Sequence, residues 1–229
     1  MLPSNRSFKP AVLLSLSKIE KSYVTAEGPL KVLRGISFEL ESGKSLALIG
    51  ESGCGKSTLL HLVAGLDQPD AGAIHLAGTD LTKMNDAARA SLRRGTVGLV
   101  FQQFNLIPSL NVADNLSFHA QLSKRYDATW INLIIKKLGL GELLSRYPEH
   151  LSGGQQQRVA IGRTLAVKPQ LVLADEPTGN LDEATGDAVL DLMLSMVKET
   201  GSALMMATHS SRLASRLDGH LKLHAGLIS

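Results

Sequence analysis

The stretch GESGCGKS at residues 50–57 constrains the fold of this 229-residue chain more than any other feature. It satisfies the pattern G-x-x-x-x-G-K-[ST], which forms a phosphate-binding loop when a strand precedes it and a helix follows it. Both are expected here, because the apolar run Ser45–Ile49 comes directly before it and Lys56–Ala64 has helical spacing. The alternative is a glycine-rich turn with an accidental lysine, which the flanking elements argue against. The sequence predicts an α/β fold built around this phosphate loop, residues 50–57.

The phosphate loop has predicted roles for its individual side chains. Gly53 and Gly55 permit a tight turn whose backbone N–H groups face the phosphates, at the positive end of the next helix dipole. Lys56 would contact the β- and γ-phosphates, Ser57 would offer its hydroxyl to Mg²⁺, and Thr58 would reach the α-phosphate region. The nucleotide-binding residues predicted here are Gly50, Glu51, Ser52, Gly53, Cys54, Gly55, Lys56, Ser57 and Thr58.

A second signal is an apolar run that ends in two carboxylates, LVLADE at residues 171–176. Such a run is typical of a central parallel strand that delivers charge to the carboxyl edge of its sheet. Asp175 is expected to hold Mg²⁺ through its water shell, and Glu176 to polarise the water that attacks a phosphate. A capping turn before Pro177 is the alternative, which the phosphate loop upstream disfavours.

Two further strand ends carry polar side chains. The run ALMMATHS ends at His209, whose imidazole could reach a γ-phosphate and the water beside it, although a lone histidine is usually a surface or core residue. Gln102 follows the run VGLVF and could give an amide oxygen to Mg²⁺ and the water. The neighbouring Gln103 leaves that register open.

The stretch LSGGQ at residues 151–155 begins a long run of helical spacing. Ser152 is a good helix N-cap, and Gly153 and Gly154 let the backbone approach an anion closely. One chain therefore has two helix starts of the kind that bind phosphate.

The remaining pattern indicates one compact unit, because no internal repeat, low-complexity tract or linker interrupts it. Strands are expected at Leu13–Ile19, Val32–Leu40, Ser45–Ile49, Ile74–Ala77, Val97–Phe101, Leu171–Ala174, Ala203–Thr208 and His220–His224. Helices are expected at Lys56–Ala64, Val112–Leu122, Thr129–Leu138, Gly154–Ala166, Ala184–Lys198 and Ser211–Leu217. The strand-free region from Asn105 to Leu151 predicts a helical insertion in an α/β core.

Composition excludes several classes of protein. The net charge of +3 comes from 24 basic and 21 acidic residues that intermingle, and only 4% of residues are aromatic, so we expect no nucleic-acid partner. The single cysteine, Cys54, rules out an intramolecular disulfide. Residues 1–23 are not interpreted as a signal peptide, since Ser15, Ser17 and Lys18 interrupt the apolar run. No run of eighteen apolar residues exists, so any membrane connection must come through a partner.

These motifs resemble the nucleotide-binding subunit of ABC transporters, over essentially the whole chain. LSGGQ is similar to the ABC signature, ATHS contains the switch histidine, VFQQ resembles the Q-loop, and GNLD at Gly179–Asp182 resembles the D-loop. Tyr23 falls where the family places an aromatic ring that stacks on adenine, the alternative being a tyrosine packed at a strand end. The resemblance implies the ABC ATPase fold, a P-loop NTPase core with a mixed sheet, an antiparallel β subdomain and a helical signature subdomain.

The resemblance also implies boundaries, an activity and ligands. Residues 1–229 would form a single ABC ATPase domain, with a core at about 1–104 and 167–229 and the helical subdomain at about 105–166. The chain would hydrolyse ATP with Mg²⁺ by in-line attack of water, in a head-to-tail dimer. In that dimer Ser152, Gly153, Gly154, Gln155 and Asp182 of one copy would complete the nucleotide site of the other.

Finer features resemble one branch of the family. The stretches FQQFNLIPSLNVADNL, LSGGQQQRVAIGRTLA and DEPTGNLDEATGD are similar to macrolide-exporter, lipoprotein-releasing and YbbA-type ATPases. This chain departs from the usual pattern of that branch at IGRTLA, where the branch more often has alanines. This resemblance implies an integral membrane permease subunit docking near Phe104–Phe118, a place on the cytoplasmic face of the inner membrane, and export or extraction of amphiphilic substrates such as lipoproteins, peptides or drugs.

Three other classes of protein share part of this pattern. A division-type ABC ATPase, which drives a membrane complex that regulates wall hydrolases without moving a solute, stays open at the level of sequence. A translation or DNA-repair ATPase would carry two cassettes or a long coiled coil. A phosphate-loop kinase or GTPase would leave LSGGQ unexplained, and no NKxD motif occurs.

Overall fold

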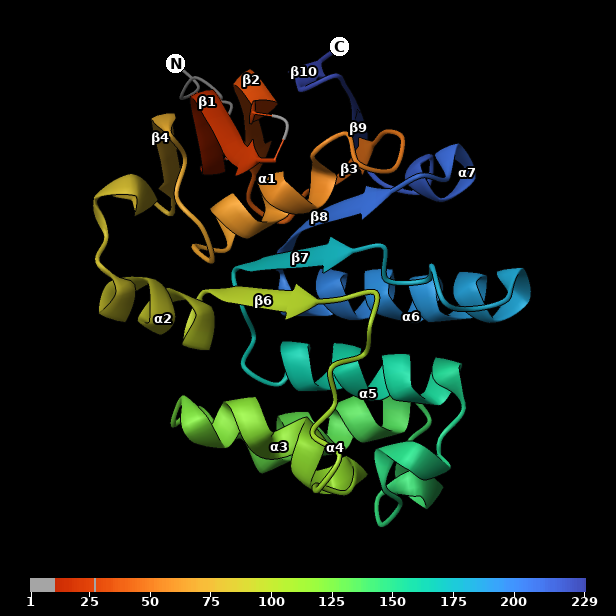
Figure 1. Cartoon of the computed structure of the whole chain (residues 1–229). Helices are drawn as coiled ribbons and strands as arrows, with labels where there is room; N and C mark the ends of the chain where they lie inside the picture. Colours follow the sequence, from red (N-terminus) through yellow and green to blue (C-terminus); the bar gives the residue numbers. More distant parts are fainter. Residues whose placement is uncertain (1–10, 27) are drawn as a thin grey trace, which may run out of the picture.

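The computed structural model describes residues 11–26 and 28–229. Residues 1–10 of the predicted core, which begin the segment interpreted as not being a signal peptide, lie outside the described residues. In the part that is described, the strands form two sheets and the helices pack around them (Figure 1). No described helix has both the length and the apolar character needed to span a bilayer.

A six-stranded sheet runs through the middle of the molecule, in the order β10-β9-β3-β8-β7-β6. The pairs β3·β8, β3·β9, β7·β8 and β6·β7 are parallel, and β10·β9 is antiparallel, so the sheet is mixed. Its strands are β3 (Ser45–Ile49), β6 (Val97–Val100), β7 (Leu171–Asp175), β8 (Ala203–Thr208), β9 (Gly219–His224) and β10 (Leu227–Ile228).

A second sheet is antiparallel throughout, in the order β2-β1-β4-β5. Its strands are β1 (Val12–Thr25), β2 (Gly28–Glu41), β4 (Ala71–Leu76) and β5 (Thr79–Asp80). Thr25 and Gly28 face each other at the hairpin end of β1 and β2. The two sheets confirm the predicted fold class, with its mixed sheet and separate antiparallel sheet.

The helices lie in layers on either side of the six-stranded sheet (Figure 1). Helix α1 lies between the two sheets, and α6 and then α5 lie beyond the opposite face of the six-stranded sheet. The α-helices are α1 (Lys56–Val63), α2 (Asp86–Gly95), α3 (Val112–Leu122), α4 (Ala128–Lys137), α5 (Gly153–Leu165), α6 (Glu183–Thr200) and α7 (Ser211–Ala214). Short 3₁₀ helices cover Leu81–Lys83, Gly141–Leu143 and Pro148–His150.

Alternate residues of the central strands enter two different hydrophobic cores. Leu171 and Leu173 of β7 pack with α1 and the antiparallel sheet. Val172 and Ala174 pack with α6 and with the helices α3, α4 and α5. This alternation follows from the period of two along a strand, and it explains why β7 reads as a continuous apolar run.

The helices α3, α4 and α5 share the core that lies under the sheet. Leu116 of α3, Ile134 of α4 and Ile161 of α5 are all buried in it. Trp130 of α4 donates from its indole nitrogen to the carbonyl oxygen of Leu165, at 2.9 Å. Because this core is continuous, the helical part is fixed to the sheet; its predicted boundaries at about 105 and 166 stay a prediction.

Two helices differ from expectation. The sequence pattern predicts no helix at residues 86–95, yet α2 forms there, capped by Asn85, whose side chain accepts from the Ala88 N–H. The segment is mostly polar and has few apolar residues to mark a buried face, since only Leu92 and Gly95 are buried. The predicted helix Ser211–Leu217 is wrong at its end: α7 stops at Ala214, and the following N–H groups make shorter three-residue turns.

Candidate active site

The phosphate loop lines a cavity of about 450 Å³. It leads directly from β3, and β7 delivers the acidic pair to the same cavity. Ten of the predicted site residues line it together with Val32: Tyr23, Ser52, Gly53, Gly55, Lys56, Ser57, Thr58, Gln102, Asp175 and Glu176. Residues from four distant parts of the sequence thus meet at one place.

Lys56 closes the phosphate loop on itself. Its Nζ donates to the carbonyl oxygens of Gly50, at 2.7 Å, and Glu51, at 2.8 Å, and its side chain is only 5% exposed. Gly55 is the N-cap of α1, and among the described residues no side chain caps the start of that helix. These N–H groups therefore remain available to an anion, at the positive end of the helix dipole.

Two glycines of the loop are required by sterics. A Cβ at Gly50 would lie 2.4 Å from the Leu223 carbonyl oxygen and 2.6 Å from Cys54 Sγ. Gly55 has φ of 107° and faces Val32, so a side chain there would meet both backbone strain and a clash. The motif's first and last glycines are thus needed for the loop to pack against its own fold.

Three predicted catalytic or phosphate-binding groups lie together at the mouth of the loop. Glu176 Oε1 lies 3.9 Å from Lys56 Nζ, and its Oε2 lies 3.3 Å from His209 Nδ1. The Glu176 side chain is 22% exposed, whereas that of His209 is 65% exposed. A half-buried carboxylate between a lysine and an imidazole is suited to hold a water and to move its proton.

The backbone of Glu176 is held in an unusual conformation. Its φ is 45°, a left-handed value that costs a non-glycine residue roughly 1 kcal/mol or more. Two hydrogen bonds hold it there: its N–H donates to the Ala207 carbonyl, and its own carbonyl accepts from the Gly179 N–H. The chain therefore turns sharply after β7. As a result, the side chain of Glu176 leaves the chain in a different direction from that of Asp175, which is still in the strand.

Gln102 is oriented by Asn180. The side-chain Nε2 of Gln102 donates to Asn180 Oδ1 at 3.2 Å, and Asn180 Nδ2 donates back to the main-chain carbonyl oxygen of Gln102 at 2.9 Å. The Gln102 amide oxygen is therefore left for the cavity, which also contains Ser57 and Asp175. Amide, hydroxyl and carboxylate oxygens form a donor set that fits Mg²⁺.

Tyr23, on β1, lies at the edge of the cavity and is held by Asp67 and Lys21. Its hydroxyl donates to Asp67 at 2.9 Å, and Lys21 Nζ lies 5.1 Å from the centre of its ring. Lys21 also donates to Asp67. Burial acts to raise the pKa of Asp67, but hydrogen bonds from Lys21, the Gln68 N–H and Tyr23 outweigh it and lower that pKa. The ring is thus a fixed, partly exposed platform.

Comparison with known proteins gives this geometry its family. The model of the family described as "ABC transporter" matches residues 33–179. The chain belongs to the ABC transporter family. It is an ATPase, the ATP-binding subunit of a transporter.

Relatives of this ABC ATPase match it over nearly their whole length. YbbA of Escherichia coli K12, an uncharacterized ABC transporter ATP-binding protein, is 43% identical over 217 residues, covering 93% of this chain and 95% of YbbA. The lipoprotein-releasing system ATP-binding protein LolD 2 of Caulobacter vibrioides is 42% identical over 221 residues, covering 92% and 97%. The ATP-binding cassette MJ0796, solved as a dimer bound to ADP and Pi after hydrolysis, superposes with a TM-score of 0.86 at 31% identity, covering 95% of this chain and 97% of that chain.

The ABC signature of this ATPase lies away from the phosphate loop of the same chain. Ser152 caps α5 by accepting from the Gln155 N–H at 3.3 Å, and the Gln155 side chain accepts from the Ser152 N–H at 2.9 Å. Ser152, Gly154 and Gln155 line a separate cavity with the first half of α6, and Gly153 faces Leu181 and Phe104. None of the described residues is shared between this cavity and that of the phosphate loop.

Asp182, the last predicted site residue, caps α6 by accepting from the Thr185 N–H at 3.0 Å. Hydrogen bonds from Thr185 lower the pKa of its carboxyl. It lines a hollow of about 220 Å³ that also contains Glu176 and His209. The D-loop and the switch histidine of the ABC ATPase are therefore neighbours within one chain.

Sequence reasoning missed several residues that hold this site. Asp67 and Lys21 fix Tyr23, Asn180 orients Gln102, and Arg212 lines the hollow beside His209. Asn180 lies in the GNLD stretch, whose resemblance to the D-loop does not by itself predict a contact with Gln102. The others carry no sequence signal, since each acts through a contact between residues far apart in the chain.

Proposed function

We propose that two copies of this ATPase bind ATP between them, head to tail. The phosphate loop of one copy would face the Ser152 helix start of the other, so each nucleotide is held by both chains. Three features support this arrangement: the separate cavities of the two helix starts, the absence of side-chain capping at α1, and the dimeric structure of the relative MJ0796. Both helix starts suit the negative charge of a phosphate.

We assign the chemical roles as follows. Lys56 and the N–H groups of the loop bind the β- and γ-phosphates, and Tyr23 stacks on the base. Glu176 accepts a hydrogen bond from the attacking water and orients it, while His209 donates to the γ-phosphate. The observation that carries this assignment is the position of the Glu176 carboxylate between Lys56 and His209.

Mg²⁺ would bind at Ser57, Asp175 and Gln102 together with the nucleotide. When bound, it supplies positive charge that offsets the charge developing on the phosphate oxygens. The chain's own part is to orient these oxygens, which Asn180 does for Gln102.

Replacing Glu176 by Gln tests the central assignment. We expect ATP binding to persist, a nucleotide-bound dimer to accumulate, and turnover to fall by about 10²- to 10⁴-fold, the range typical of a lost general base. Steady-state hydrolysis and size-exclusion chromatography with ATP measure these effects. Glu142→Gln, which alters an exposed carboxylate on a 3₁₀ helix, serves as the matched control. Normal hydrolysis by the Glu176 variant would remove that residue from its assigned role.

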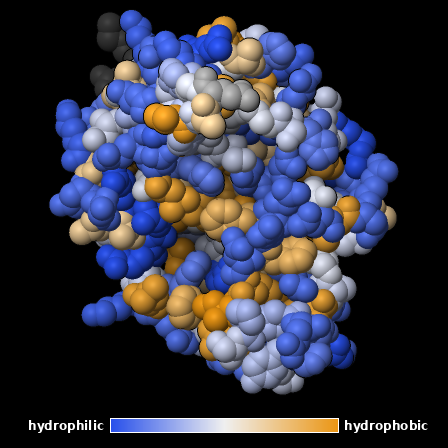
Figure 2. Space-filling model, viewed as in Figure 1, coloured by the Kyte–Doolittle hydropathy of each residue, from blue (hydrophilic) through white to orange (hydrophobic). Residues whose placement is uncertain are grey.

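We also propose that a membrane subunit docks in a groove between α2, β6, α3 and α5. The groove, of about 310 Å³, is lined by Leu66, Ala90, Arg93, Arg94, Val97, Gly98, Leu99, Phe101, His119, Leu122, Arg163, Thr164 and Val167. Figure 2 shows hydrophobic atoms gathered over β6 and α3 on this face. The groove adjoins the segment Phe104–Phe118 named from the sequence, and its lining falls on both sides of that segment.

The chemistry of this groove selects a cytoplasmic amphipathic helix that carries a carboxylate. Leu122 lines the groove with an exposure of 60%, and Phe118, next to the lining residue His119 in the sequence, has an exposure of 36%. Arg94 is exposed and makes no ion pair, and the buried Nε of Arg163 has no hydrogen-bond partner, with any residue the structure describes. An apolar face would cover the leucine and phenylalanine, and an acidic side chain would meet the arginines.

A docking variant tests this surface separately from the chemistry. Leu122→Glu is expected to lower co-purification of the membrane subunit while leaving ATP binding by the isolated subunit intact. Leu227→Glu, at an exposed leucine of β10, is the matched control. Equal co-purification of the two variants would place the docking surface elsewhere.

The transporter would thus work at the cytoplasmic face of the cell membrane, with this chain attached through its partner. We propose amphiphilic substrates such as lipoproteins, peptides or drugs, because LolD 2 is named for lipoprotein release. The transporter names of the relatives favour this over a division-type complex. Identification of the molecule bound to the purified complex tests the substrate class.

A further inference from the structure

His209 is held by a turn that leads into a very short helix. The Ser210 N–H donates to Thr208 Oγ1 at 3.1 Å, and Ser210 Oγ accepts from the Leu213 N–H at 3.3 Å. The helix that follows, α7, has only four residues. Helix formation is unfavourable until several turns form, so a helix of this length depends on tertiary contacts. Whatever holds α7 therefore also places His209.

Part of that support is a set of ion pairs that α6 makes with Arg212 of α7 and with Arg216, which lies just beyond the end of α7. Arg212 Nη1 donates to both carboxylate oxygens of Asp187, at 2.7 and 2.8 Å, and Nη2 lies 3.1 Å from Glu183. Arg216 lies 3.4 Å from Asp187 and also pairs with Asp191. These five residues form an arginine ladder.

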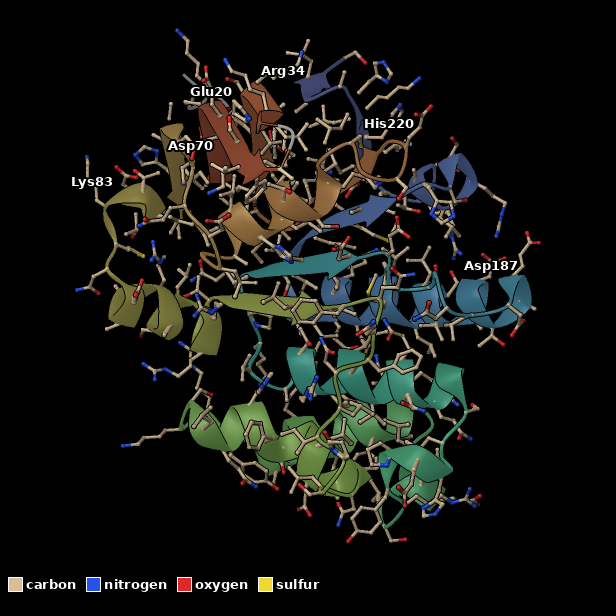
Figure 3. The ribbon with its side chains drawn as sticks, viewed as in Figure 1. Glu20, Arg34, Asp70, Lys83, Asp187 and His220 are labelled. Atoms are coloured by element: carbon tan, nitrogen blue, oxygen red, sulfur yellow. The ribbon has the colours of Figure 1, made fainter. Side chains whose placement is uncertain are left out.

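The spacing of the ladder matches the period of a helix. Glu183, Asp187 and Asp191 recur every four residues on α6, and Arg212 and Arg216 are also four apart. Figure 3 shows Asp187 on the side of α6 nearest to α7. Hydrogen bonds to Asp187 raise the pKa of Arg212 above its ordinary value. An isolated exposed ion pair contributes little, but Arg212 uses one nitrogen for Asp187 and the other for Glu183, and such a planar two-nitrogen contact within a network fixes geometry.

The ladder links two functional residues. Glu183 directly follows Asp182, the N-cap of α6, and Arg212 is three residues beyond His209. Asp182, Glu183, Asp187, His209 and Arg212 all line the hollow that contains Glu176. At this end of the ladder, its α6 side is thus attached to the predicted D-loop and its Arg212 side to the predicted switch histidine.

We propose that Arg212 is a positioning residue for ATP hydrolysis, which, helped by Arg216, holds His209 against Glu176 and ties that position to the D-loop end of α6. This inference rests on the proposed role of His209. It makes the placement of His209 depend on α6, the helix whose start we expect to meet the second copy. Arg212 itself touches neither nucleotide nor water in this proposal.

Arg212→Gln tests the proposal by separating kcat from KM. Because Tyr23 and the phosphate loop are untouched, we expect KM for ATP to stay within about twofold while kcat falls roughly tenfold, as small misplacements of catalytic groups do. Arg212→Lys keeps the charge but lacks the second nitrogen that pairs with Glu183, so its kcat should lie between those of the wild type and Arg212→Gln. Lys137→Gln, which breaks the ion pair with Glu199 near the other end of α6, is the matched control.

A double-variant comparison shows whether Arg212 acts through His209. In a His209→Ala background, Arg212→Gln should cause no further loss of kcat, whereas a merely structural role would reduce it again. The imidazole NMR signal of His209, assigned from His209→Ala, should shift in Arg212→Gln and stay unchanged in Lys137→Gln. Arg216→Gln repeats the kcat and NMR tests if Arg212→Gln lowers the melting temperature strongly.

The outcomes separate this inference from the proposed function. If His209→Ala alone leaves kcat unchanged, the proposed role of His209 fails. If His209→Ala lowers kcat but Arg212→Gln and Arg216→Gln do not, the positioning role is overturned and the proposed function stands. Equal losses in the Arg212 and Lys137 variants would likewise overturn it.

Discussion

Single residues of this protein serve the site by being held in place. Glu176 keeps a left-handed backbone through two hydrogen bonds, and Tyr23 is fixed by Asp67 and Lys21. Pre-positioned groups lose less entropy when the substrate binds, so positioning is the main contribution the chain can make to phosphoryl transfer. A single residue can also set how stability depends on pH, as His119 of the docking groove does.

His119 predicts a loss of stability in acid. Burial, and then the positive charge of Arg163, lowers the pKa of its imidazole from 6.5 to about 4. At acidic pH the folded state thus binds fewer protons than the unfolded state. The contribution of His119 to the free energy of unfolding is therefore fully present above pH 6.5 and is lost as the pH falls toward 4. The whole shift would correspond to about 3 kcal/mol, but His119 is exposed at the surface, where solvent screens the effect, so we expect about 1 kcal/mol.

Urea unfolding at pH 7.5 and pH 5 measures this effect. The wild-type chain should lose more free energy of unfolding between the two pH values than His119→Gln, which carries no titrating group there. An identical loss in both proteins would show that the His119 imidazole does not titrate differently in the folded state.

At the scale of elements, the sequence predicted most of the α/β core because its strands are apolar on both faces. Ser45–Ile49, Val112–Leu122 and Ala203–Thr208 agree with the structure to the residue. The polar helix α2 was missed because few apolar residues mark its buried face, and α7 was extended too far because its support comes from α6 rather than from its own sequence. The site shows the same limit: motif residues were found, whereas Asp67, Asn180 and Arg212 depend on tertiary contacts.

The departure at IGRTLA has a structural explanation in the packing of α5. Gly162 lets α5 approach α3 and α4 closely, since a Cβ there would lie 2.5 Å from Leu116 Cδ2. The buried Thr164 hydroxyl donates to the Leu99 carbonyl of β6 at 2.8 Å. These two residues join the helical part to the edge of the sheet, beside the docking groove.

Thr164→Val tests that junction with nearly constant volume. Loss of the buried hydrogen bond to Leu99 should lower the free energy of unfolding by about 1–2 kcal/mol. Chemical denaturation measures the change, and Thr129→Val, at the exposed start of α4, is the control. A change within about 0.5 kcal/mol would show that the hydroxyl is not needed to join β6 and α5.

At the scale of the whole molecule, each chain carries its two proposed phosphate-binding helix starts in separate cavities. The phosphate-loop cavity and the signature cavity have no described residue in common. Isologous pairing of two copies would bring both halves together twice, as a two-fold symmetric dimer requires. An experiment that mixes two variants of the chain tests this arrangement.

Two inactive variants should restore activity to each other. Lys56→Ala lacks a phosphate-binding lysine, and Ser152→Glu sets a carboxylate against the phosphate. A mixed dimer retains one intact site, built from the Lys56 of one chain and the Ser152 of the other, so an equal mixture should recover up to roughly a quarter of wild-type activity. Titrating one variant into the other while measuring ATPase activity tests this; no recovery in dimers shown to be mixed contradicts the shared site.

The hydrogen bonds of Lys56 within its own loop bear on nucleotide exchange. Because the ammonium donates to the carbonyl oxygens of Gly50 and Glu51, the lysine itself holds the shape of the loop, and little ordering is needed when a nucleotide arrives. Loss of the terminal phosphate would then leave this seat in place. What it would remove is the bridge between Lys56 and the neighbouring molecule, so the product would loosen the pair of chains rather than the loop.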